Sequence, residues 1–235
     1  MIYGRTWRAI HLLFSGDRCH FRKYAMFKRL FAFLSRAPAP TPTPAPPTAD
    51  DVSDVDEDAR LIEQAAAYRS AMPPFMDVVA GHLPADERER LTSSILAQFD
   101  DDEDEMGGDR ETVGELFFEA MFGDEGQHHD HRLLISVDWK ASDQIDWQAN
   151  EILAMHGIDD EWDWDYDGKT VMDGMAVLSA WLKRHALALL SIDFGHDAYQ
   201  MFIVTEDIAP QAVALGQRAG LNVLSFPDFA VTQGA

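Results

Sequence analysis

Two segments of the sequence gather side chains that could do chemistry. The first is SIDFGHDAYQMFIV, residues 191–204, where Asp193, His196 and Asp197 lie close together between two apolar runs. Carboxylate and imidazole groups hold divalent metal ions or act as general acids and bases. The same residues fit a hairpin turn, in which Gly195 takes a positive φ and an aspartate caps backbone amides. We prefer the hairpin turn, because no motif for a nucleophile or for phosphate binding accompanies the segment.

The second segment is DEGQHHDHR, residues 124–132, with three histidines directly before an apolar run. Imidazole suits zinc, nickel and similar divalent ions, although clustered histidines are also common in solvated loops. A metal site would form if this cluster met the 193–197 loop in space, and no other cofactor is expected. The candidate metal ligands are His128, His129, His131, His196 and Asp193.

A third segment, DDEWDWDYDG at residues 159–168, alternates aromatic and acidic side chains. Alternation of this kind separates the aromatic side from the carboxylate side. The aromatic rings can pack inward beneath a loop, or they can bind a basic partner, since Trp and Tyr are frequent at binding hot spots. The candidate partner-binding residues are Trp147, Trp162, Asp163, Trp164, Asp165 and Tyr166.

The charge of the chain is unevenly distributed. Residues 1–36 carry eight Lys or Arg and one acid, a net of +7, whereas the remaining residues carry 11 basic and 40 acidic groups, a net of −29. A body this acidic repels nucleic-acid phosphates, so we expect cations or basic protein surfaces as its partners. The single cysteine, Cys19, excludes a disulfide framework and a cysteine-based zinc site in the body, which fits a reducing cytoplasm.

The N-terminal part differs from the body. Residues 37–49, APAPTPTPAPPTA, form a proline-rich linker that must be extended. Before it, apolar residues at helical spacing over 27–34 are surrounded by basic ones, which is typical either of peripheral contact with an anionic membrane or of a disordered basic leader. Residues 1–25 show no period, so Met1 and Met26 are both candidate start sites.

Apolar periodicity predicts the elements that position these segments. Helical stripes predict helices over 61–68, 91–99, 113–121, 142–157, 170–185 and 208–219. Short apolar runs predict strands over 132–139, 187–192, 198–204 and 221–226. In the helix after the first strand, Ser142 is the expected N-cap and Gly157 the expected stop.

This order of elements predicts an α+β fold. We expect a small mixed β-sheet with packed helices, preceded by a helical subdomain and by a disordered basic and proline-rich tail. The expected segments are a leader (1–36), a proline-rich and acidic linker (37–58), a helical subdomain (59–126), an α+β domain (127–226) and a tail (227–235).

The stretches SVDWKASDQIDWQANEIL and LLSIDFGHDAYQMFIV resemble an uncharacterised bacterial domain family of unknown function, over about residues 132–224. The resemblance rests on Asp138, Trp139, Lys140, Asp146, Trp147, Asp193, Gly195, Asp197 and Tyr199. It implies domain boundaries and brings no reaction, cofactor or catalytic residue. A weaker likeness to acidic domains of the immunity-protein type implies a protein that masks a partner and needs no catalytic centre.

We therefore predict an acidic, cytoplasmic protein that is a non-enzymatic interaction module and binds a basic protein partner, with neutralisation of a toxin as one example. The alternative is a metal-dependent enzyme that uses His128, His129 and His131 together with the 193–197 loop. No nucleic acid is expected to bind through the body.

Overall fold

The computed structural model describes residues 51–104 and 112–234. The chain divides into two compact units, Met1–Asp51 and Val52–Ala235, and the described strands all belong to the second. The predicted leader, the predicted membrane-contacting segment over 27–34 and both candidate start sites lie outside the described residues. Within the described part of the chain, no helix has the length and apolar character needed to cross a membrane.

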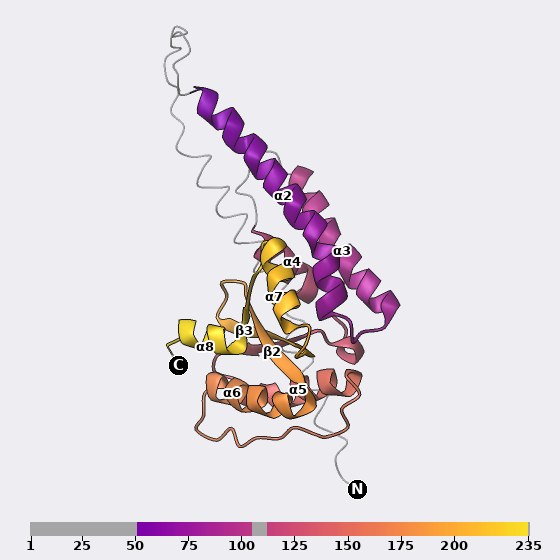
Figure 1. Ribbon diagram of the computed structural model, residues 1–235, viewed down its shortest axis with the longest axis vertical. Coiled ribbons are helices and arrows are strands. Elements are labelled where there is room, and N and C mark those ends of the chain that lie inside the picture. The colour runs from indigo at the N-terminus through magenta and orange to yellow at the C-terminus, as the bar shows by residue number, and fades with distance from the viewer. Residues whose placement is uncertain (1–50, 105–111, 235) are drawn as a thin grey trace. The chain divides into compact units, whose positions relative to one another are not determined.

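The described residues form helices around one four-stranded sheet, which confirms the α+β class (Figure 1). The helices are α2 (Asp51–Val79), α3 (Ala85–Asp104), α4 (Val113–Phe122), α5 (Ile145–Met155), α6 (Val171–Leu182), α7 (Ala209–Arg218) and α8 (Phe226–Thr232). The strands are β1 (Leu134–Asp138), β2 (Leu187–Asp193), β3 (Ala198–Thr205) and β4 (Asn222–Ser225). Short 3-10 turns are η1 (His129–His131), η2 (Ser142–Gln144) and η3 (Lys183–His185).

The sheet is antiparallel between all described neighbours, so the predicted mixed sheet is wrong. Its strand order is β1-β3-β2-β4. β1 and β2 run in the same direction, but the β2–β3 hairpin places β3 between them. β4 then pairs antiparallel with the other side of β2. The sequence shows the order of the strands along the chain but not which strands become neighbours.

One face of the sheet packs against α2, α3, α4 and α7. On this face Leu190, Ile192 and Phe202 belong to one buried cluster with residues of those helices. Phe75 of α2 joins the helices and the sheet in this one core. Its ring lies 6.2 Å from that of Phe117 in α4 and 5.8 Å from that of Phe202 in β3. The predicted boundary near residue 126 therefore does not separate two cores.

The other face packs against α5, α6 and α8 (Figure 1). The alternation of β2 and β3 places Leu187, Leu189 and Met201 here, opposite to the first cluster. Phe229 of α8 is also buried in this cluster, so the predicted tail at 227–235 is instead a core helix. Each fully buried Leu or Phe contributes about 2 kcal/mol to the free energy of unfolding.

Helix ends depart from the sequence-based expectations in two places. α2 begins at Asp51, so the end of the predicted linker (37–58) is helical. Ser142 is not an N-cap, because residues 142–144 form η2 and α5 starts only at Ile145. Gly157 does end the helix, with φ 73. α6, which lies beneath the sheet, is fixed by a capping box between Thr170 and Asp173.

Candidate functional site

The 193–197 segment is the turn of the β2–β3 hairpin. β2 ends at Asp193 and β3 begins at Ala198. Gly195 has φ 74, and its N–H donates to Oδ1 of Asp193 at 2.8 Å. This is an Asx turn, the arrangement in which an aspartate closes a turn on the residue two positions later. The carboxylate of Asp193 is therefore held in a fixed position beside the turn.

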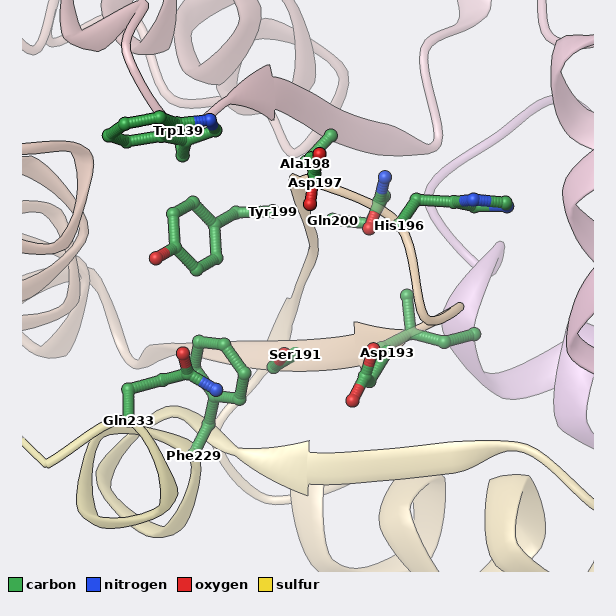
Figure 2. Close-up of a pocket in the computed structure, with 11 residues that line it drawn as sticks. Trp139, Ser191, Asp193, His196, Asp197, Ala198, Tyr199, Gln200, Phe229 and Gln233 are labelled. Carbon is green, nitrogen blue, oxygen red and sulfur yellow. The ribbon is translucent and has the colours of Figure 1, made fainter.

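His196 faces α4 and does not face the neighbouring serine of β2. Its ring lies 4.5 Å from that of Phe118, and it is one of the groups that lower the pKa of Glu115, after the hydrogen bonds from Thr112. Figure 2 shows its imidazole pointing away from Ser191. The two side chains share no hydrogen bond in the described part of the chain, so they form no nucleophile and base pair.

The histidine segment before β1 has other neighbours. Hydrogen bonds from Arg90 hold the pKa of Glu87 below its usual value, and the charges of His128 and His131 add to this effect. Among the described side chains, no group of three His, Cys, Asp or Glu could hold a metal ion. The side chain of His129 lies outside the described residues, so the predicted metal set of these histidines with Asp193 and His196 stays a prediction.

The aromatic and acidic loop packs its two tryptophans inward. Trp162 is 1% exposed and Trp164 is 7% exposed, and their rings stack at 6.1 Å. Asn150 fixes the loop, since its side chain both donates to the carbonyl oxygen of Trp162 and accepts from its N–H, each at 2.9 Å. Of the predicted partner-binding residues here, only Asp163, Asp165 and Tyr166 are exposed.

Trp147 already has partners within the chain. Its ring is 38% exposed, and the guanidinium of Arg132 lies 4.6 Å from its centroid. Its indole N–H donates to Oε1 of Gln144 at 3.0 Å. A partner protein could therefore reach only part of this ring.

A pocket of about 300 Å³ lies at the turn end of the β2–β3 hairpin (Figure 2). Trp139, Tyr199 and Phe229 supply aromatic walls from the end of β1, from β3 and from α8. The rings of Tyr199 and Phe229 meet edge to face at 6.0 Å. The backbone N–H of Trp139 donates to the carbonyl oxygen of Asp197 at 3.4 Å, which ties the end of β1 to the hairpin turn.

Two polar side chains of the pocket have no partner in the described part of the chain. Ser191 is 2% exposed, yet its hydroxyl makes no hydrogen bond to the described residues. Nε2 of Gln200 is also buried without an acceptor, but Gln200 alternates with Tyr199 along β3 and so points to the opposite face of the sheet. Asp197 has an exposed carboxylate that joins no ion pair there, and no Lys or Arg lines the pocket. Buried polar groups usually are hydrogen-bonded, so the Ser191 hydroxyl marks a place where a ligand can complete the structure.

The sequence pointed to three of the lining residues, Asp193, His196 and Asp197, and did not reveal the pocket that they share with the aromatic side chains. Period-two alternation could have revealed Ser191, because it lies on the same strand face as Asp193. The wall from α8 could not be assigned, since the residues after 226 were expected to be a tail.

Comparison with known proteins gives one finding. A family model described as a domain of unknown function, DUF6630, matches residues 78–227, well over half of the chain, and the chain therefore belongs to that family. The match starts upstream of the resemblance over 132–224 and includes α3 and α4, in agreement with the core that these helices share with the sheet. No curated protein and no solved structure matches.

Proposed function

We propose that this DUF6630 protein is a non-enzymatic module that binds a basic protein partner. The observation that carries the proposal is the composition of the hairpin pocket. The carboxylates of Asp193 and Asp197 lie in it beside three aromatic rings, and no Lys or Arg lines it. Aromatic and acidic groups together favour a cationic ligand.

The charge around the pocket supports the same partner. From Thr112 to Ala235 the chain has six Lys or Arg and 21 Asp or Glu, a net of −15. Among the basic groups, Arg132 pairs with Glu151 at 2.6 Å, and Lys169 pairs with Asp165 at 3.2 Å. The field of the unpaired carboxylates attracts basic surfaces and raises their association rate.

The geometry of the hairpin favours binding over catalysis. The buried hydroxyl of the pocket, that of Ser191, makes no hydrogen bond to a base in the described part of the chain. His196, the nearest histidine in the sequence, packs on Phe118. A binding module needs the pocket and the charge, and it does not need a nucleophile.

The test is affinity capture with the full chain as bait, from a native lysate at low salt, followed by identification of the retained protein and measurement of its dissociation constant with purified components. We expect a protein rich in Lys and Arg. The double variant Asp193→Asn/Asp197→Asn should retain it weakly. The matched control Asp163→Asn/Asp167→Asn removes the same charge from an exposed loop and should retain it well.

Two outcomes count against the proposal. The first is that no basic protein is retained even at low salt. The second is that both double variants retain the protein equally, because the pocket carboxylates would then contribute no more than the general charge of the surface.

A further inference from the structure

We infer that the hairpin pocket receives a single arginine side chain, presented on a peptide segment of the basic partner. This inference rests on the proposed function and names the group that the pocket would bind. Three properties of the pocket lead to it: its volume, the placement of its carboxylates and its aromatic walls.

The volume limits what can enter. A pocket of about 300 Å³ is at the lower end of the range for ligand sites. It has room for one long side chain and not for a larger folded element. The partner therefore inserts one residue, and the rest of the contact lies on the surface around the hairpin.

The carboxylates favour a guanidinium group. Asp193 accepts the N–H of Gly195 at Oδ1 and a longer hydrogen bond from Nδ2 of Asn222, 3.5 Å away, at Oδ2. Each of its oxygens keeps a further acceptor site, and Asp197 keeps all of its own within the described part of the chain. A guanidinium has five N–H donors in a planar fork and can bond both groups, whereas an ammonium is a compact and strongly hydrated charge. The hydroxyl of Ser191 can accept one further N–H at the base of the pocket.

The aromatic walls favour the same group. The ammonium of Lys140 lies 4.3 Å from the centroid of the Trp139 ring, which shows that a cation already rests on this indole. Trp139 is 53% exposed and can stack a planar guanidinium. Lys140 competes with an incoming cation at this ring, so its removal should strengthen binding.

The experiment titrates the full chain with N-acetyl-argininamide and with the neutral isostere N-acetyl-citrullinamide. Calorimetry gives the dissociation constants, and NMR follows the indole N–H of Trp139. We expect the arginine derivative to bind with a dissociation constant on the order of a millimolar. The citrulline derivative should bind at least about tenfold more weakly, and the Trp139 signal should shift only with the arginine derivative.

Variants locate the binding. Asp197→Asn should weaken binding of the arginine derivative about fivefold or more, and Lys140→Gln should strengthen this binding. Asp163→Asn, which removes one equal charge from the surface loop, should leave the dissociation constant unchanged. Circular dichroism and thermal unfolding establish that each variant is folded.

The outcomes separate this inference from the proposed function. If the citrulline derivative binds as tightly as the arginine derivative, or if Asp197→Asn and Asp163→Asn behave alike, the inference is wrong. If a basic partner is captured but the arginine derivative does not bind, the inference fails and the proposed function stands. If the arginine derivative binds but no basic protein does, the pocket takes a free ligand and the proposed function fails.

Discussion

The side-chain amide of Gln148 hydrogen-bonds both backbone groups of Ser136. Oε1 of Gln148 accepts the N–H of Ser136 at 2.8 Å, and Nε2 donates to its carbonyl oxygen at 3.0 Å. β1 pairs only with β3 in the described part of the sheet, so these groups lie on an open strand edge. Gln127 continues the pattern by accepting the N–H groups of Leu133 and Leu134 at 3.0 and 2.9 Å.

Replacing this buried amide should destabilise the protein and expose the strand edge. Gln148→Leu leaves the N–H and carbonyl of Ser136 without partners, which should lower the free energy of unfolding by about 3 kcal/mol. Urea unfolding measures the loss, and size-exclusion chromatography measures self-association through the edge. Gln211→Leu, at an exposed position of α7, is the control and should change stability by less than about 0.5 kcal/mol. Equal losses for the two variants would contradict the role of Gln148.

The protein should become less stable as the pH decreases, because of a stacked histidine pair. The rings of His82 and His156 lie 4.4 Å apart, and burial, with a smaller contribution from His156, lowers the pKa of His82 from 6.5 to about 4. The pKa of His156 is also lowered, by burial. Because the unfolded chain takes up the proton first, stability is complete above about pH 6.5 and is lost progressively as pH falls toward 4.

The size of this effect can be measured between pH 7 and pH 5. Over that interval His82 alone should lower the free energy of unfolding by about 2 kcal/mol. His82→Phe should reduce the pH dependence of this free energy by the same amount. Most carboxylates titrate below this window and contribute equally to both proteins. Chemical unfolding at a series of pH values gives the two curves, and parallel curves would show that His82 does not carry the dependence.

Two glycines within helices should respond oppositely to alanine. A Cβ at Gly174 of α6 would lie 2.5 Å from side-chain atoms of both Ile145 and Trp164, so Gly174→Ala should destabilise by about 1–3 kcal/mol. A Cβ at Gly114 of α4 would meet only ordinary contacts from 3.7 Å, so Gly114→Ala should stabilise by about 0.5 kcal/mol. Thermal unfolding gives the sign of each change. Red-shifted tryptophan fluorescence in the first variant alone would report displacement of Trp164.

Metal content tests the alternative enzyme. Protein purified without a histidine tag or a metal column should contain less than one divalent ion per two chains by elemental analysis, because the described side chains of the histidine segment lie near Glu87 and form no three-ligand group. A full equivalent of metal that disappears in His128→Ala/His131→Ala would contradict this expectation and would favour the metal-dependent enzyme.

Much of the fold could be predicted from the sequence because its signals are local. Alternation and a central glycine placed the β2–β3 hairpin within one residue of its observed ends. The hairpin turn itself followed from the conformational freedom of Gly195 and the capping ability of Asp193. The errors concern relations between distant segments, such as the neighbours of β1 and the joint core of Phe75 and Phe202.

The pocket could be predicted only in part for the same reason. Its two carboxylates lie in one turn, whereas its aromatic walls come from three elements that are distant in sequence. α8 had a readable signal, since Ser225 caps it and Pro227 stands in its first turn, a pattern typical of helix starts. No sequence pattern places Phe229 opposite Tyr199, because that contact depends on the packing of α8 against the sheet.

The closure of the β1 edge by Gln148 also limits how a partner can be recognised. Strand addition requires free N–H and carbonyl groups along an edge, and at Ser136 these groups are already occupied. A partner is therefore not selected at this position for its ability to extend the sheet. Recognition at this edge has to rest on side chains, so an arginine on a helix, a loop or a terminal segment would serve equally well there, and partners with unrelated folds can compete for one protein.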